Sequence, residues 1–238
     1  MNIVPSDQFT TAELAELFNR GYEGYGVPIH IDEPTMEYIV TSWSIDLSRS
    51  RVAEGAGICN LGVRGDHGWI GGLGVVPAQR RKGIGRALME SVLDVAPSTV
   101  DLEVLEQNDG AKRLYDDLGF EVTRLLEIWS LPEQPEVEAR QVDPAPLGQR
   151  DLPWQRADES LPDDYERWEV DGGAMLLKGG NVLQLQARDS DAATALLSRG
   201  KALTYVNVPE GDVASAALAA MGGTMSLRQY EMRLQRSA

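Results

Sequence analysis

The feature that most constrains the fold is a basic, glycine-containing loop between an apolar segment and a helical one. Residues 73–86 read LGVVPAQRRKGIGR, and a helix-forming segment follows. Because Gly83 and Gly85 carry no Cβ, consecutive backbone N–H groups can converge on an anion at the positive end of that helix. The loop also carries the basic residues Arg80, Arg81, Lys82 and Arg86. The segment therefore predicts a strand–loop–helix unit that binds a nucleotide-like pyrophosphate.

The spacing distinguishes this loop from two other kinds of phosphate-binding loop. It lacks the Gly-Lys-Ser/Thr ending of nucleoside-triphosphate sites and the three-glycine fingerprint of dinucleotide sites. Both of those site types are therefore excluded at this position. For the loop taken alone, an ordinary solvated start of a basic helix is the alternative interpretation.

A second motif follows the next predicted strand. Apolar and acidic residues alternate from 100 to 106, which predicts a strand, and Asn108 or Asp109 can cap the helix after it. The apolar stripe of this helix consists of Ala111, Leu114 and Leu118. Gly119 ends the helix. Tyr115 lies one position past the stripe, so its phenol can point along the helix flank toward the end of the strand.

Together the two motifs resemble those of the GNAT acetyltransferase superfamily. Arg80-x-x-Gly83-x-Gly85 after Gly-Val-Val-Pro is similar to the loop that holds the pyrophosphate of acetyl-coenzyme A (acetyl-CoA) in that superfamily. Residues 102–120 resemble its catalytic half, most closely in the ribosomal-protein alanine acetyltransferase type. The resemblance implies an α/β (α+β) GNAT fold, with a mixed, mostly antiparallel sheet flanked by helices. It also implies an N-acetyltransferase whose cofactor is acetyl-CoA.

The resemblance assigns candidate residues to this cofactor. They are Gly74, Val75, Val76, Arg80, Arg81, Lys82, Gly83, Ile84, Gly85, Arg86 and Asn108. Gly71, Gly72 and Gly74 crowd one strand, which indicates either a bulge or a close approach by another backbone or ligand. In the resembled family the two coincide, because a bulge at this place opens a V-shaped gap that receives the pantetheine arm.

Direct transfer of an acyl group to an amine needs an acid for the leaving thiolate and a base for the amine. The resemblance makes Tyr115 the general acid, and a partly buried phenol keeps its proton at neutral pH. Glu103 matches the general base of the family, while Asp101 on the same strand face and ordered water are alternatives. Backbone N–H groups near Val75 and Val76 would polarise the thioester carbonyl. Glu103 is followed by Val-Leu-Glu, where alanine acetyltransferases usually have Val-Arg, so the acceptor is not carried over.

Composition limits the partners. A net charge of −15 disfavours nucleic acid and anionic membranes. No apolar run approaches the roughly 20 residues that span a bilayer, and no basic leader precedes an apolar stretch at the amino terminus. Cys59 is the single cysteine, which suits a reducing compartment. We therefore expect a cytoplasmic protein, and the oligomeric state is left open.

The loop at residues 21–28 lies between two predicted helices, residues 11–19 and 33–43. In the resembled fold this loop and the second of these helices overhang the acceptor side, so the candidates for substrate contact are Glu23, Tyr25 and Asp46. A solvated connection with aromatic packing is the alternative. His30 and His67 lack a cysteine or second histidine at ligand spacing, so we expect solvated turn residues and no metal site.

The composition changes after residue 131, where proline-containing segments begin. We expect a catalytic GNAT domain at residues 1–131, a linker at 132–150 and a second domain at 151–238. The strand and helix order of the second domain repeats that of residues 57–131. An offset of 222 − 119 = 103 superposes apolar positions, for example Leu131 on Leu234, which favours a duplicated GNAT fold over an unrelated α+β appendage.

The second copy is expected to have lost its chemistry. Leu218 stands where the first copy has Tyr115. The segment at residues 188–193 lacks glycine and carries Asp189 and Asp191, whose carboxylates would repel a pyrophosphate. We therefore expect one acetyl-CoA per chain and a degenerate second domain.

Three classes of function follow from these motifs. The first is an N-acetyltransferase for a primary amine, that of a small molecule or, alternatively, of a protein amino terminus or lysine. The second is a non-catalytic acyl-CoA sensor, and the third is an interaction module that retains only the fold. The intact motifs, with Tyr115, argue against the third and favour the enzyme over the sensor.

Overall fold

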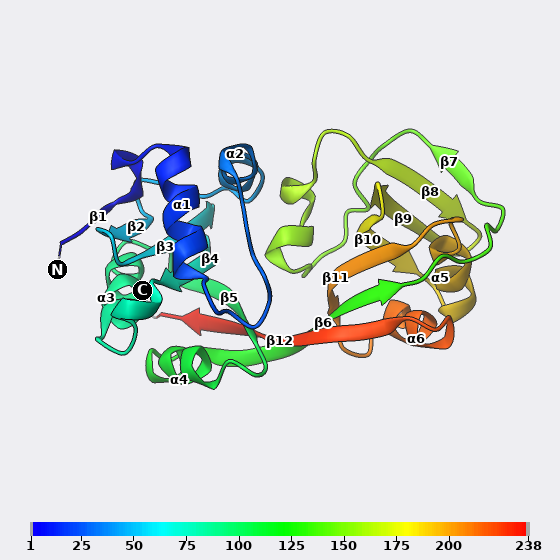
Figure 1. Cartoon of the computed structure of the whole chain (residues 1–238). Helices are drawn as coiled ribbons and strands as arrows, with labels where there is room; N and C mark the ends of the chain where they lie inside the picture. The colour runs from blue at the N-terminus through cyan, green and yellow to red at the C-terminus, as the bar shows by residue number, and fades with distance from the viewer. Residues whose placement is uncertain (1, 237–238) are drawn as a thin grey trace. The chain divides into compact units, whose positions relative to one another are not determined.

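A computed structural model of the chain describes residues 2–236, which divide into two compact units (Figure 1). Unit 1 comprises residues 2–104, 108–121 and 232–236, and unit 2 comprises residues 105–107 and 122–231. The units interleave along the chain, whereas the expected division was sequential. Residues 132–150, expected as a linker, lie within unit 2 and include a short strand at Arg140–Val142.

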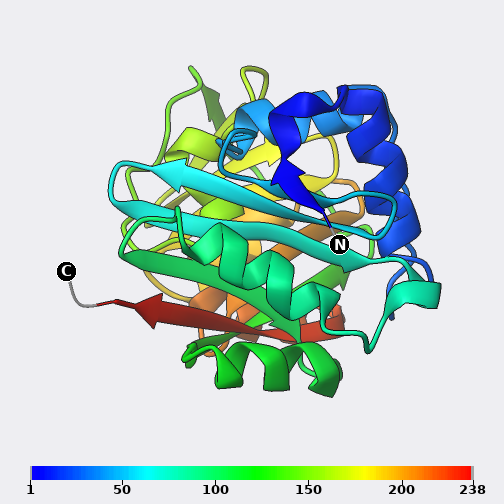
Figure 2. The same cartoon turned by 90° about the vertical axis from the view of Figure 1, so that its left-hand side faces the viewer.

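Unit 1 contains a sheet whose strand order is β1-β2-β3-β4-β5-β12. Its elements are β1 (Ile3–Pro5), α1 (Thr11–Gly21), α2 (Glu33–Ser42), β2 (Arg51–Ala53), β3 (Gly57–Arg64), β4 (His67–Val75), α3 (Ile84–Leu93), β5 (Thr99–Leu105), α4 (Asp109–Asp117) and the end of β12 (Thr224–Gln235). Strands β1 to β4 pair antiparallel, and β4 pairs parallel with β5. The expected mixed, mostly antiparallel GNAT sheet flanked by helices is confirmed (Figure 2).

Local sequence explains the helices that flank this sheet. Thr10 caps α1, and Glu13 returns a hydrogen bond to the Thr10 backbone, which forms a capping box. The stripe that α1 buries consists of Leu14, Ala15, Leu17 and Phe18. Asn108 caps α4 by accepting a hydrogen bond from the backbone N–H of Ala111 at 3.2 Å. Helices α1 and α4 therefore both start at a side-chain cap and pack through their apolar faces.

Strands β4 and β5 separate after a short ladder. The paired residues run from His67 opposite Thr99 to Ile70 opposite Leu102. Within the described residues no further pair joins them, although β4 continues to Val75 and β5 to Leu105. The register between β3 and β4 shifts at the same place, because Gly71 is an extra residue between the partners of Asn60 and Leu61. The bulge that the glycines predicted is thus confirmed, and the strands part beside it.

The same glycines admit a close approach by α1. A Cβ on Gly72 would lie 2.9 Å from the Phe18 ring, and one on Gly74 would lie 3.2 Å from both the Cα of Gly21 and the Tyr22 ring. We expected a pantetheine arm to explain the missing side chains, whereas this face of β4 is covered by α1. On the opposite face, Gly85 of α3 lies over Leu73 and Val75.

Unit 2 contains a sheet of strand order β12-β6-β11-β10-β9-β8-β7. Its elements are β6 (Glu121–Leu131), β7 (Arg140–Val142), β8 (Glu166–Val170), β9 (Gly173–Lys178), β10 (Asn181–Ala187), α5 (Ser190–Leu197), β11 (Leu203–Pro209), α6 (Val213–Ala220) and most of β12. Its core includes Trp129, Met175, Leu177, Leu196, Tyr205 and Leu218. The sequence analysis did not predict β7 or β8. β7 spans only three residues and is exposed along most of its length.

Unit 2 repeats the strand separation of unit 1. β10 and β11 are parallel, and their ladder ends at Val182 opposite Tyr205. The register between β9 and β10 shifts at Leu183, one residue after that last pair, as it does at Gly71 after Ile70. Tyr205 lies 205 − 102 = 103 positions after Leu102, which is the offset that the apolar pattern predicted. The duplicated fold therefore extends to the bulge and the end of the ladder.

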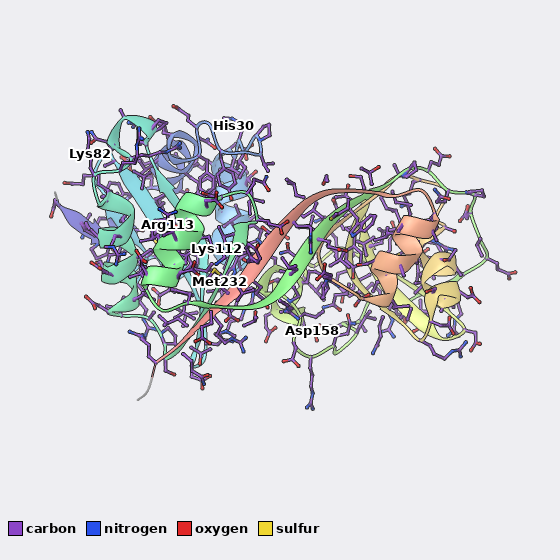
Figure 3. All side chains as sticks on the ribbon, turned by 90° about the horizontal axis from the view of Figure 1, so that it is seen from below. His30, Lys82, Lys112, Arg113, Asp158 and Met232 are labelled. Carbon is purple, nitrogen blue, oxygen red and sulfur yellow. The ribbon has the colours of Figure 1, made fainter. Side chains whose placement is uncertain are left out.

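The last strand of the chain completes unit 1. Met232, labelled in Figure 3, is the first residue of β12 that belongs to this unit. Downstream, the Arg236 guanidinium donates to three carbonyl oxygens of unit 1, those of Leu93, Ala96 and Pro97. A fragment ending at residue 131 would lose these bonds. No helix within residues 2–236 is long and apolar enough to cross a membrane.

Candidate active site

The basic loop of unit 1 leads into helix α3, whose N-terminus has no side-chain cap. A 3₁₀ turn, Pro77–Gln79, leads to Arg81 and Gly83, whose φ angles are +60° and +81°. Gly83 is the N-cap of α3 and supplies no side-chain hydrogen bond, and a Cβ placed on it would meet no atom within 4 Å. The first N–H groups of α3 therefore have no side-chain partner, and the space before them is open. This arrangement fits a pyrophosphate.

The four basic side chains of the loop have different roles. The Arg80 guanidinium donates to the carbonyl oxygens of Val75 (2.8 Å), Gly21 (3.0 Å) and Glu23 (2.6 Å), so it ties the loop to the end of α1. Arg86 forms ion pairs with Asp117 at 2.9 Å and Glu90 at 3.6 Å. Both were expected to bind the cofactor, and part of their hydrogen-bonding capacity is used within the protein.

Arg81 and Lys82 are better placed to meet an anion. Both side chains are exposed, and neither forms an ion pair among the described residues. The Lys82 ammonium, in the loop labelled in Figure 3, donates to the carbonyl of Ala78 at 2.9 Å. Ile84 buries its side chain, so only its backbone can face a ligand.

The backbone near Val75 and Val76 is partly engaged. The N–H of Val76 donates to the carbonyl of Ala56 at 2.9 Å. We expected this N–H to polarise a thioester carbonyl, and it is not available for that role. Val75 pairs with Gly57 of β3, and its carbonyl accepts from Arg80. In this part of β4, the edge that faces away from β3 is the one left for a ligand.

Tyr115 reaches an aromatic cluster. It is 6% exposed and packs against Phe120 with ring centroids 5.9 Å apart. Burial raises the pKa of Tyr115 well above its usual range, and the neighbouring Tyr22, Cys59 and Tyr25 raise it further. No hydrogen bond to the Tyr115 hydroxyl is formed by the described part of the protein. The phenol therefore stays protonated at neutral pH, and its hydroxyl retains its donor.

Tyr22 locates this cluster at β4. Its ring stacks on Phe18 at 4.3 Å and meets the edge of Tyr25 at 5.1 Å. Its hydroxyl lies 3.1 Å from the position that a Cβ on Gly72 would take, just past the end of the β4–β5 ladder. Sequence reasoning missed Tyr22, although the run Gly-Tyr-Glu-Gly-Tyr pointed to the segment.

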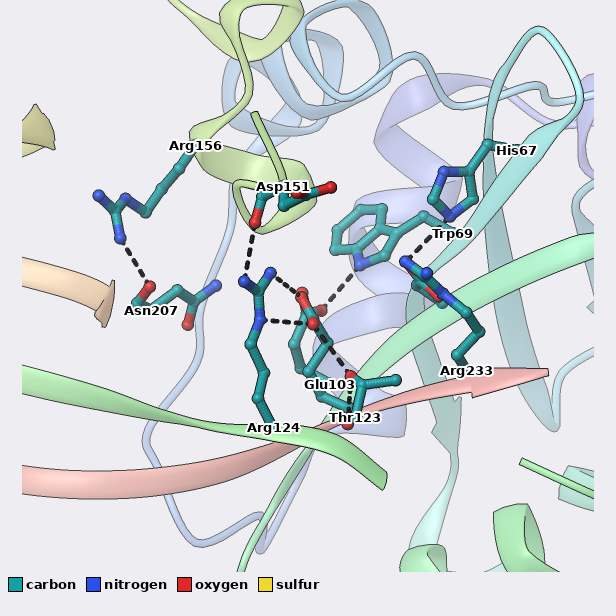
Figure 4. Close-up of polar contacts among 11 residues, drawn as sticks. His67, Trp69, Glu103, Thr123, Arg124, Asp151, Arg156, Asn207 and Arg233 are labelled. Atoms are coloured by element: carbon teal, nitrogen blue, oxygen red, sulfur yellow. Dashed lines mark hydrogen bonds and ion pairs between the residues drawn. The ribbon is translucent and has the colours of Figure 1, made fainter. Parts of the chain in front are cut away.

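The two candidate bases on β5 have different partners. Glu103 accepts a hydrogen bond from the indole of Trp69 at 2.7 Å (Figure 4). Trp69 is buried and contacts Trp43, which caps the end of α2, with ring centroids 5.6 Å apart. Glu103 therefore lies on the face of the sheet that α2 covers.

Asp101 is held in an ion-pair network. Its two carboxylate oxygens accept from Arg233 at 2.7 Å each, and one of them lies 2.9 Å from Nε2 of His67. Figure 4 labels Arg233 and His67. Burial raises the pKa of Asp101, but the hydrogen bonds and charges of Arg233 and His67 outweigh it and place the pKa below its usual range. Asp101 is thus a poor base, and His67, expected as a solvated turn residue, is a partner of it instead.

The candidate substrate residues separate into two groups. A pocket of about 530 Å³ at the connection between α1 and α2 is lined by residues that include Glu16, Asn19, Tyr22, Glu23, Tyr25 and His30. Asp46 lies outside this pocket, and its carboxylate accepts from the backbone of Ser48 and Arg49. It shapes a turn, so only Glu23 and Tyr25 are brought together as expected.

Comparisons with known proteins agree with this geometry. Residues 8–120 match the Acetyltransferase (GNAT) family. Nearly the whole chain is similar in structure to solved proteins that include the following three. A protein of Pyrococcus horikoshii that is proposed to be an acetyltransferase is 17% identical, with TM-score 0.72 and coverage of 99% of this chain and 89% of that chain. A GCN5-related N-acetyltransferase from Sphaerobacter thermophilus is 16% identical, with TM-score 0.69 and coverage of 100% and 96%.

The third structure is a tandem GNAT protein from the clavulanic acid biosynthesis pathway, 15% identical, with TM-score 0.63 and coverage of 100% and 99%. No curated protein matches the chain. The likeness at this level of identity supports the fold, including its duplication. The family match covers the loop, Glu103 and Tyr115. Residues 8–120 therefore form an acetyltransferase domain of the GNAT family, whose cofactor is acetyl-CoA, and the chain has the GNAT fold.

Proposed function

We propose that unit 1 transfers the acetyl group of acetyl-CoA to the primary amine of a small molecule by direct attack. The observation that carries this proposal is the hydroxyl of the buried Tyr115, which forms no hydrogen bond within residues 2–236 and lies near Tyr22 at the end of the β4–β5 ladder. Such a hydroxyl is suited to donate its proton to a thiolate as that charge develops.

The residues of unit 1 divide the work as follows. The first turn of α3, with Arg81 and Lys82, holds the pyrophosphate, because its N–H groups lack a side-chain cap. When bound, acetyl-CoA supplies the thioester carbonyl and the thiol leaving group. Glu103, oriented by the Trp69 indole, takes the proton of the attacking amine directly or through water. Tyr115 protonates the leaving group.

The pocket beside α1 supports a small acceptor. Its volume of about 530 Å³ is within the range of small-molecule sites. Glu23 and Tyr25 offer a carboxylate and an aromatic face to an ammonium group. A protein amino terminus or lysine is the alternative acceptor, and a non-catalytic acyl-CoA sensor is the alternative function.

A free-thiol release assay tests this function. The full chain is incubated with acetyl-CoA and either a panel of small primary amines or a panel of amino-terminal and lysine peptides. We expect thiol release with at least one small amine and none with peptides. Release with peptides only would make the chain a protein acetyltransferase, and acetyl-CoA binding without release from any amine would favour the sensor.

Glu103→Gln tests the base. The pH–rate profile of the wild type should have an alkaline-rising limb that shifts in this variant, because an amide cannot accept the amine proton. A limb that stays in place would assign the proton to water, since Asp101 is already held by Arg233.

A further inference from the structure

Unit 2 retains the strand separation but fills it with its own chain. Past the pair of Val182 and Tyr205, no residue pair joins β10 to β11 within the described residues, although the strands continue to Ala187 and Pro209. In unit 1 the backbone groups at this place belong to the gap in which the family holds its cofactor. In unit 2 they need another partner, because an unpaired buried carbonyl is costly.

Arg156 is that partner. It is the last residue of a 3₁₀ turn, Trp154–Arg156, and is 6% exposed. Its Nη1 donates to the carbonyl of Asn207 on β11 at 2.8 Å (Figure 4), and its Nε donates to the carbonyl of Leu183 on β10 at 3.3 Å. Leu183 comes directly after the last paired residue of β10, and Asn207 comes two residues after the last paired residue of β11. One guanidinium therefore bridges the two strands where their own ladder stops.

Tyr205 completes the pocket around this guanidinium. The carbon at the centre of the guanidinium lies 4.4 Å from the centroid of the Tyr205 ring, and Nη2 donates to the Tyr205 hydroxyl. No carboxylate forms an ion pair with Arg156 among residues 2–236. The buried charge is thus held by two carbonyl dipoles, a phenol oxygen and an aromatic face.

The segment that carries Arg156 is fastened at both sides of the gap. On β10, the buried Gln184 donates to the carbonyl of Arg156 and to the Asp158 carboxylate, both at 2.8 Å. On β11, the amide of the fully buried Asn207 donates to Gln155 at 2.7 Å. Asn207 has a φ of +59°, a left-handed conformation that β11 adopts at its bulge. The turn is therefore held as a fixed part of unit 2.

We infer that unit 2 contains a preformed guanidinium site between β10 and β11, in which Arg156 is the bound ligand. The site is complementary in shape and hydrogen bonding to a planar fork of donors, and an ammonium group cannot span its two carbonyls. Two consequences follow. A chain without this side chain takes up a small guanidinium from solution, and the filled gap does not admit acetyl-CoA.

Chemical rescue tests the first consequence. Arg156→Ala in the full chain should lower the melting temperature by roughly 5–10 °C, because buried acceptors lose their donor. Methylguanidinium at millimolar concentration should raise the melting temperature of Arg156→Ala in a saturable way, and methylammonium should not. The matched control is Arg188→Ala, which removes an exposed arginine of unit 2 and should show no rescue. Absence of rescue by methylguanidinium, or equal rescue by methylammonium, would overturn the inference.

The second consequence does not depend on the folding of that variant. Titration calorimetry of the wild type should detect one equivalent of acetyl-CoA, and in the double variant Gly83→Val/Gly85→Val the affinity of that equivalent should fall about tenfold or more. A second equivalent, whose affinity the double variant leaves unchanged, would show that the gap of unit 2 is open and contradict the inference.

Arg156→Lys gives a further measurement of the first consequence. It keeps the charge and loses the fork of donors, so it should be destabilised as Arg156→Ala is.

Discussion

The two units begin the helix after their central strand in opposite ways. In unit 1, Gly83 precedes α3 and offers no side-chain hydrogen bond to its first turn. In unit 2, Asp189 precedes α5 and accepts a hydrogen bond from the N–H of Ala192 at 2.9 Å. A carboxylate of the chain thus occupies the position at which an anionic ligand would bind. The comparison shows that a duplicated fold can lose a ligand by supplying its own substitute.

The gap between the central strands shows the same difference. In unit 1, the buried Tyr115 places a hydroxyl that forms no hydrogen bond to the described residues near the point where β4 and β5 part. In unit 2, Leu218 replaces that tyrosine, and Arg156 bridges the strands. Hydrogen-bonding capacity is kept for a ligand in one unit and used internally in the other.

The largest expected effect belongs to Tyr115. Tyr115→Phe should lower kcat by about 10²–10⁴-fold, the usual contribution of a general acid. The KM for acetyl-CoA should change little, because the hydroxyl acts mainly when thiolate charge develops. Steady-state thiol release measures both constants. As the matched control, Tyr205→Phe changes the corresponding gap of unit 2 and should leave kcat unchanged. A Tyr115→Phe enzyme of wild-type kcat would remove the functional contrast between the units.

Much of the fold could be predicted because each copy carries its own local signals. The offset of 103 places Tyr205 on Leu102, and the structure pairs both residues at the end of a ladder. Gly71 and its neighbours predicted the bulge. The interleaving of the units could not be predicted, because it depends on the neighbours of β12, and periodicity does not specify which strands become neighbours.

The next largest effect concerns Asp101, whose counterpart at 101 + 103 is Thr204 of unit 2. Asp101→Asn should lower the free energy of unfolding by about 2 kcal/mol at neutral pH, because charge-assisted hydrogen bonds to Arg233 and His67 are lost. The cost stays at this level because the Arg233 side chain is 44% exposed. Thr204→Val is the matched change in unit 2 and should cost less. Denaturant unfolding measures both.

The pH dependence of the difference in unfolding free energy between the wild type and Asp101→Asn shows whether the Asp101 charge causes it. The pKa of Asp101 is lowered in the folded protein, so its contribution is complete above the unfolded pKa and is lost as pH falls through the folded pKa. The wild type should therefore exceed Asp101→Asn by a constant amount above about pH 5, and the difference should shrink below about pH 4. A difference that persisted at pH 2 would mean that the amide disturbs packing.

The candidate site was predictable only where its parts are close in sequence. The glycine loop and Tyr115 lie within two compact motifs. By contrast, Arg233 meets Asp101 across 132 residues, and Arg156 meets Asn207 across 51. Arg156 also lies in a proline-containing segment without helical or strand periodicity, so no pattern marks it as buried. Internal substitutes for a ligand are long-range contacts, and a single sequence does not reveal them.

The third prediction tests the open helix start. Gly83→Val/Gly85→Val should weaken acetyl-CoA binding about tenfold or more, because side chains block the N–H groups that the helix dipole makes favourable for an anion. Gly55→Val is the control, since Gly55 also has positive φ, at +68°, with no atom within 4 Å of its Cβ position. It introduces similar backbone strain away from the loop. Equal loss of affinity in both proteins would assign the effect to strain.

The smallest expected effect concerns the occupied helix start of unit 2. Asp189→Ala removes the cap of α5 and should lower the free energy of unfolding by about 1 kcal/mol. The control is Asp191→Ala, which removes a carboxylate from the first turn without removing the cap, and it should cost less. Differential scanning calorimetry of both variants gives the comparison.

Asp189→Ala also distinguishes the effect of the Asp189 cap from that of the Arg156 bridge in unit 2. Without the carboxylate, the first turn of α5 resembles that of α3 more closely, but the segment still lacks glycine and Arg156 still bridges β10 and β11. We therefore expect one acetyl-CoA per chain in calorimetric titration of this variant. A second binding event after removal of the cap alone would mean that the helix start controls access of acetyl-CoA to unit 2. The Arg156 bridge would then not be what excludes the cofactor, contrary to the comparison of the two units.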